Sequence, residues 1–130
     1  MTNPVGRMTV PLLVVDAANV VGSVPDGWWR DRAGATTRLR DRLVAVAGRG
    51  LPDLPPPLDV LLVVEGRARG VEPIEGVRVL AAPGSADDAI VELLAREPAE
   101  RVRVVVTADR GLRERVTGLG ATVLGPRALG

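Results

Sequence analysis

The chain has 130 residues, of which 46% are hydrophobic and only 2% aromatic, with a formal net charge of +1. This length and hydrophobic share suit one globular domain and exclude a disordered chain. The absence of His, Cys and Lys excludes a Ser–His–Asp triad, a thiol nucleophile, a zinc finger, a Schiff base and a Walker A loop. Carboxylates, Ser, Thr, Asn and Arg remain for any chemistry.

The first half of the chain predicts two buried strands on either side of one long helix. We expect residues 1–9 to be a flexible lead-in and residues 10–130 to form a single domain. A Val-rich run over 10–15 predicts a strand buried on both faces, and it ends at Asp16. Apolar spacing from Asp31 to about Ala47 predicts a helix ended by Gly48 and Gly50. After a proline-rich connector, residues 59–64 predict a second strand.

The second half predicts three more strands and two helices. Residues 77–81 alternate in polarity and suit a strand at a sheet edge. Ser85 is a good N-cap for a helix that reaches about Arg96. Residues 102–107 and 121–124 predict strands on either side of a short helix over 110–117. The order β-α-β-β-α-β-α-β predicts an α/β fold of three layers, with a mostly parallel sheet of about five strands and helices on both faces.

Acidic residues follow several of these strands. Asp16, Glu65 and Asp109 each stand at or just past the carboxyl end of an apolar run, and such ends meet at one edge of a parallel sheet. Asp87 shares a helix face with Ile90 and therefore points inward, whereas Asp88 points toward solvent. Because clustered like charges need neutralising, we expect Mg²⁺ or Mn²⁺ at this edge. The alternative is that these acids only complement helix dipoles or cap helices.

Three motifs resemble the NYN domain, a PIN-like family of metal-dependent ribonucleases. They are D-A-A-N-V at 16–20, S-A-D-D-A-I at 85–90 and V-T-A-D-R at 106–110. The resemblance implies that Asp16, Asp87 and Asp109 are catalytic and bind the metal, and the place of Glu65 at a strand end adds it to the expected metal ligands. The resemblance further implies supporting roles for Asn19, Thr107 and Asp88. Where the family often has Asp after its second strand, this chain has Glu65.

The resemblance implies an RNA partner, which the net charge of +1 does not by itself indicate. All 17 basic residues are Arg, whose planar fork binds phosphate at two points. We expect Arg30, Arg38, Arg42, Arg110 and Trp28 to contact RNA, single-stranded or structured. A metal-dependent nucleotide pyrophosphohydrolase and a non-catalytic nucleic-acid-binding module remain alternatives. We expect no membrane partner and a cytoplasmic location, since no apolar run approaches the roughly 20 residues of a membrane span. The oligomeric state stays open, with a homodimer as one option.

Overall fold

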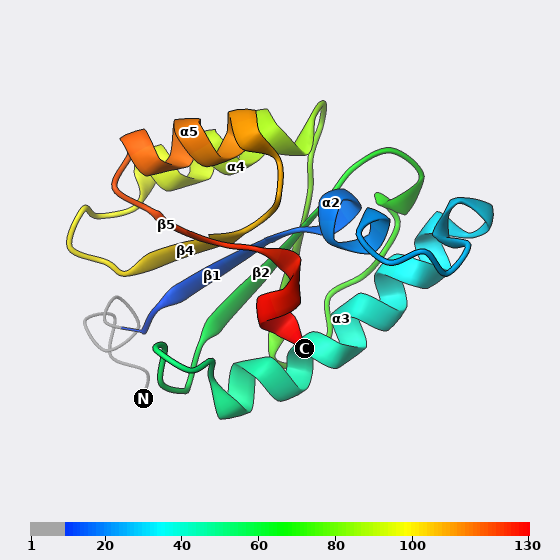
Figure 1. The fold of residues 1–130 in the computed structure, drawn as a ribbon, viewed down its shortest axis with the longest axis horizontal. Coiled ribbons are helices and arrows are strands. Elements are labelled where there is room, and N and C mark those ends of the chain that lie inside the picture. Colours follow the sequence, from blue (N-terminus) through cyan, green and yellow to red (C-terminus); the bar gives the residue numbers. More distant parts are fainter. Residues whose placement is uncertain (1–9) are drawn as a thin grey trace.

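The computed structural model describes residues 10–130, which form a five-stranded sheet with helices on both faces (Figure 1). The strands are β1 (Leu12–Asp16), β2 (Asp59–Val64), β3 (Val77–Ala81), β4 (Arg103–Val106) and β5 (Thr122–Leu124). Their order across the sheet is β3-β2-β1-β4-β5, and all four pairings are parallel. The predicted three-layer α/β fold is confirmed, and the sheet is wholly parallel.

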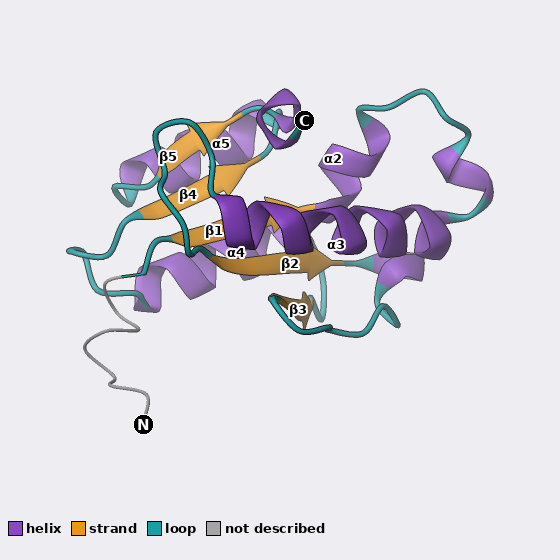
Figure 2. Cartoon of the chain, turned by 90° about the horizontal axis from the view of Figure 1, so that it is seen from below, coloured by secondary structure: helices purple, strands orange, loops and turns teal. Residues whose placement is uncertain are grey.

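Two separate apolar layers cover the sheet, because successive residues of a strand point to opposite faces. Helices α2 (Ala17–Gly22) and α3 (Arg32–Arg49) cover one face, where Leu13, Val15 and Leu62 are buried. Helices α4 (Ala86–Arg96) and α5 (Arg110–Gly118) cover the other, over Leu12 and Val14. Figure 2 shows α3 running along one side of the strands, with α4 behind them. Within residues 10–130, no helix has the length and apolar character needed to cross a membrane.

Several element boundaries differ from the sequence-based expectation. The first strand starts two residues later than predicted and includes Asp16 as its last residue. The long helix includes Gly48 and ends at Arg49, with Gly50 as its C-cap at a φ of 75° that favours glycine. The prediction that Gly48 and Gly50 end the helix is therefore confirmed for Gly50 and wrong for Gly48. The structure adds three short 3-10 helices, η1 (Trp28–Arg30), η2 (Gly66–Ala68) and η3 (Pro126–Leu129). The predicted lead-in, residues 1–9, lies outside the described residues.

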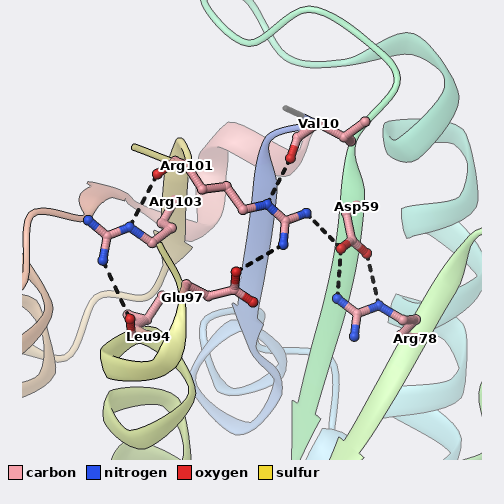
Figure 3. Close-up of polar contacts among 7 residues, drawn as sticks. All are labelled: Val10, Asp59, Arg78, Leu94, Glu97, Arg101 and Arg103. Carbon is pink, nitrogen blue, oxygen red and sulfur yellow. Dashed lines mark hydrogen bonds and ion pairs between the residues drawn. The ribbon is translucent and has the colours of Figure 1, made fainter. Parts of the chain in front are cut away.

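An ion-pair network holds the amino ends of the strands, at the edge opposite Asp16 (Figure 3). Asp59 at the start of β2 accepts bidentate hydrogen bonds from Arg78, at 2.9 and 2.8 Å. The guanidinium of Arg101, just before β4, also donates to Asp59 at 2.9 Å and to the Val10 carbonyl at 2.9 Å. Glu97 accepts from Arg101 at 3.2 Å. This edge of the sheet is therefore fixed by charge pairing, which leaves the carboxyl edge for chemistry.

Candidate functional site

Asp16 is the buried centre of the carboxyl edge. Its side chain ends β1 and is only 3% exposed. Thr107, directly after β4, donates its hydroxyl hydrogen to Asp16 Oδ2 at 2.9 Å. The pKa of Asp16 is raised from 3.8 to about 6, mainly because the carboxyl is buried; the hydrogen bond from Thr107 lowers this pKa, whereas the nearby charges of Asp87 and Glu65 raise it. A buried carboxylate with this pKa is typical of a functional site.

The loop after β4 brings Asp109 to the same edge. The Asp109 N–H donates to Thr107 Oγ1 at 3.1 Å, so one hydroxyl links the first and last acids of the cluster. Asp109 Oδ1 accepts from the Leu112 N–H at 2.9 Å and thereby caps α5. The helix-capping role that the sequence offered as an alternative is therefore present. The capping bond orients one carboxylate oxygen of Asp109 and leaves the second for another partner.

Asn19 holds this loop from the other side. Its Oδ1 accepts a 2.7 Å hydrogen bond from the Ala108 N–H, so α2 and the β4–α5 loop are joined across 89 residues of sequence. The resemblance implied that Asn19 supports the first acid. Hydrogen bonding by the backbone of Asn19 lowers the pKa of Asp16, while the side-chain oxygen of Asn19 binds the loop that carries Asp109. Support of Asp16 by the side chain of Asn19 stays a prediction.

Glu65 reaches from the end of β2 to the start of α4. Its Oε2 accepts a 2.7 Å hydrogen bond from the Ala86 N–H, the first backbone donor of that helix. Helix N-termini favour negative charge because their first N–H groups lack partners within the helix. The carboxylate of Glu65 is therefore held by a helix start, and its second oxygen remains for another ligand.

Asp87 faces the cluster, and Asp88 does not. Burial raises the pKa of Asp87, and the charges of Asp109 and Glu65 raise it further. Asp88 is exposed and pairs with Arg115 of α5 at 3.0 Å. The inward and outward positions predicted from the helix spacing are thus observed. Asp88 is linked to the site only through the cap of α4, where Ser85 Oγ accepts its N–H at 3.2 Å.

The donor chemistry of the four acids fits a hard divalent cation. Carboxylate oxygens are the ligands that Mg²⁺ and Mn²⁺ prefer. As the side chains stand, no three acidic residues between 10 and 130 are grouped closely enough to enclose a metal ion. Three of the four carboxylates are instead oriented through one oxygen each, by Thr107, Ala86 and Leu112. The residue types and their placement fit the cation, and binding would need the side chains to converge.

A cavity of about 430 Å³ opens beside the acids. Its walls include Ala18 of α2, Glu65, Ser85 and two residues that the sequence did not single out, Arg32 and Thr36. Trp28, which the sequence did single out, lines the cavity as well. Trp28 lies in η1 and Arg32 opens α3, with the non-helical N-cap Asp31 between them, so no periodic spacing in the sequence pairs the two side chains.

The predicted arginine contacts spread over a long surface. Arg30 lies in η1 at the cavity end of α3, and Arg110 opens α5 beside Asp109. Arg38 and Arg42 are exposed, but they lie six and ten residues beyond Arg32 along α3. At ~1.5 Å per residue they are about 9 and 15 Å further from the cavity. They suit contacts with distant phosphates better than contacts at the acids.

Comparisons with known proteins show the fold. No protein-family model matches the chain, and no curated protein matches its sequence. A solved structure of Rae1 (YacP) from Bacillus subtilis is similar with a TM-score of 0.76 at 19% identity, covering 92% of this chain and 71% of that one. A mutant of Rae1 gives a TM-score of 0.70 at 21% identity, covering 92% and 72%. This likeness extends over nearly the whole parallel α/β domain.

Proposed function

We propose that this protein is a metal-dependent ribonuclease, related to the NYN domain, that hydrolyses phosphodiester bonds of RNA at the carboxyl edge of its sheet. The observation that supports the proposal is that four separate segments bring Asp16, Glu65, Asp87 and Asp109 to the same edge of the sheet, near enough for their charges to act on one another. Burial and mutual repulsion raise the pKa values of Asp16 and Asp87 there. The three sequence motifs of the NYN domain supply three of these acids, and the fold shared with Rae1 is compatible with them.

Each acid has a distinct part in this proposal. Bound Mg²⁺ or Mn²⁺ would lower the pKa of a water molecule and offset the charge of the scissile phosphate. Asp16, Asp87 and Asp109 would bind the cation, with Glu65 at the corner next to α4. Thr107 holds Asp16 by its hydroxyl hydrogen and also accepts the Asp109 N–H, so it fixes the spacing of two acids. Exposed arginines on α3 and α5 would bind flanking phosphates.

The experiment is cleavage of an end-labelled single-stranded RNA with Mg²⁺, Mn²⁺ or a chelator. We expect slow endonucleolytic cleavage that the chelator and Asp16→Asn both abolish. Glu92→Gln is the matched control, because Glu92 lies on the same helix as Asp87 but is exposed. Cleavage by Asp16→Asn at the rate of the parent would contradict the proposal.

The cavity favours a second function, hydrolysis of a small nucleotide at the same acids. Its volume of about 430 Å³ lies within the ~300–1,000 Å³ that is usual for small-molecule sites. Assays with nucleoside triphosphates separate the two functions. Asp16-dependent release of pyrophosphate without RNA cleavage would replace the ribonuclease by a pyrophosphohydrolase. RNA binding without any hydrolysis would favour a non-catalytic binding module.

A further inference from the structure

We propose that the cavity beside the acids binds one unpaired nucleobase, stacked on a platform formed by Trp28 and Arg32. The inference rests on the proposed function, because it places the base next to the phosphodiester bond that the acids would hydrolyse. It identifies the substrate as RNA with an unpaired nucleotide at the cleavage site.

The platform is rigid and built from two planar groups. Arg32, the first residue of α3, holds its guanidinium carbon 5.4 Å from the centroid of the Trp28 ring. Trp28 packs against the core beneath α2 and α3, and the Trp29 ring meets it edge-on at 6.0 Å. Aromatic rings and guanidinium planes are the side chains on which unpaired bases stack. Trp28 is therefore braced from two directions before any ligand binds.

The neighbouring pair Trp29 and Arg30 provides an internal comparison. It shows the same kind of contact, with the Arg30 guanidinium 5.9 Å from the ring centroid of Trp29. Trp29 is 55% exposed, however, and neither residue lines the cavity. Two adjacent tryptophans, each with an arginine on its ring, thus differ in access to the site. Of the two tryptophans, only Trp28 belongs to the proposed stacking platform.

The remaining walls leave room for a flat, mostly apolar ligand. Ala17, Ala18 and Val21 of α2 present small apolar side chains, and Ala68 does so from η2. Hydroxyl groups come from Thr36 and Ser85. Apolar walls with a few polar groups are the usual composition of a small-molecule site.

Glu65 connects this cavity to the acids. It lines the cavity, and its charge raises the pKa values of both Asp16 and Asp87. In the proposed complex, the phosphate of the bound nucleotide lies on the side of Glu65, which is the one of the four acids that lines the cavity. A base within a duplex is paired and stacked on its neighbours, so it would have to leave the helix to enter.

Tryptophan fluorescence tests base binding without any cleavage. The chain has two tryptophans, so Trp29→Phe leaves Trp28 as the only reporter. We expect AMP and UMP to quench this variant, whereas ribose 5-phosphate, which has no base, leaves it unchanged. In the converse variant, Trp28→Phe, the emission of Trp29 should not respond. Equal responses of both tryptophans, or an equal response to ribose 5-phosphate, would overturn the proposal.

A variant that fills the cavity tests whether the nucleobase binds there. A Cβ at Gly84 would meet nothing within 4 Å, so Gly84→Leu adds bulk to the cavity wall without a clash at the backbone. We expect it to weaken nucleotide binding roughly five- to 150-fold, the range expected for losing one stacked base. Gly48→Leu is the control, since Gly48 is equally open but lies at the far end of α3. If Gly84→Leu bound nucleotides as tightly as the parent, the base could not bind in this cavity.

Substitutions of Arg32 distinguish the effect of base stacking from the effect of its positive charge. Arg32→Lys keeps the positive charge but loses the plane, so it should bind mononucleotides as weakly as Arg32→Ala. If Arg32→Lys bound mononucleotides as tightly as the parent, the charge of residue 32 would act only on the phosphate, and the proposed stacking would be refuted. Arg30→Ala should weaken RNA binding equally for single-stranded and duplex substrates.

The outcomes distinguish this inference from the proposed function. Quenching of Trp28 by nucleotides in a protein that never cleaves RNA would support the base site and refute the ribonuclease. Asp16-dependent cleavage of RNA by a protein whose Trp28 does not respond to nucleotides, and which cuts duplex and single strand equally, would support the ribonuclease and refute the base site.

Discussion

Asp16 occupies an unfavourable position for a carboxylate that has no cation beside it. It is buried at the end of the central strand, and Glu65 and Asp87 add negative charge nearby. The hydroxyl of Thr107 compensates only in part, because burial still raises the pKa to about 6. A residue that destabilises the folded protein in this way is expected where function requires it.

Replacing Asp16 by Asn should therefore stabilise the metal-free protein at neutral pH. The folded-state pKa of about 6 exceeds the unfolded value of 3.8, so the folded protein binds the extra proton between these values. The loss of folding stability that the ionised Asp16 causes is absent below about pH 4, grows as the pH rises, and is complete above about pH 6 to 7. A shift of about two pKa units corresponds to about 3 kcal/mol, and we expect a gain of ~1–3 kcal/mol at pH 8.

Urea denaturation of both proteins at pH 5 and pH 8 measures this effect. The difference between parent and Asp16→Asn should be larger at pH 8 than at pH 5. A variant that is less stable than the parent at pH 8 would show that the charge of Asp16 is satisfied within the fold.

A divalent cation bound near Asp16 should offset the loss of stability that its buried charge causes. A cation that binds only the folded protein raises its stability, by about 2.7 kcal/mol at a concentration 100-fold above Kd. We expect millimolar Mn²⁺ to raise the melting temperature of the parent at pH 7.5. Asp16→Asn should remove this shift, while Glu92→Gln should keep it. An identical shift in Asp16→Asn and the parent would place the binding elsewhere.

At the scale of elements, the two edges of the sheet are stabilised differently. At the amino edge the Asp59 carboxylate accepts from both Arg78 and Arg101, and the buried Arg103 donates to the backbone carbonyls of Arg101 and Leu94. Burial by itself would raise the pKa of Asp59, but these two arginines outweigh it and hold the pKa below 3.8. Within residues 10–130, none of the four acids at the carboxyl edge forms such an ion pair. The two edges therefore differ in their electrostatics: opposite charges are paired at the amino edge, and like charges lie near one another at the carboxyl edge.

Asp59→Asn should destabilise the protein without changing the chemistry. It leaves the buried guanidinium of Arg101 with a neutral partner, which we expect to cost about 1–3 kcal/mol at pH 7. Because the pKa of Asp59 is lowered on folding, its contribution is present above about pH 4 and is lost as the pH falls through the folded value. Thermal melts at pH 7 and pH 3 measure the difference, which should shrink at pH 3.

Cleavage by Asp59→Asn at a temperature where it remains folded should equal that of the parent. A selective loss of activity in the folded variant would mean that the amino edge takes part in the reaction.

At the scale of the whole molecule, sequence reasoning located the acids because their positions depend on simple geometry. Apolar runs that end in Asp16, Glu65 and Asp109 share an edge as soon as the sheet is parallel. The inward position of Asp87 followed from its spacing to Ile90. These inferences need only the periodicity of each element and the topology.

The cavity depends on features that periodicity does not encode. Trp28 reaches it only because the chain between α2 and α3 turns back through η1, and the conformation of that loop has no repeat in the sequence. The hydrogen bond between Asn19 and Ala108 spans 89 residues, and no local sequence pattern predicts it. The expected grouping of Arg30, Arg38 and Arg42 took no account of the length of α3.

The central claim is that the acids at the carboxyl edge act in catalysis and do not merely cap helices, and Asp109→Asn tests it most directly. Asn caps a helix as well as Asp does, so the bond to the Leu112 N–H and the stability of the fold should be kept. Only the negative charge is lost. We therefore predict that Asp109→Asn melts like the parent, binds single-stranded RNA equally well or more tightly, and does not cleave it in Mn²⁺. Cleavage at the rate of the parent by this folded variant would contradict the account.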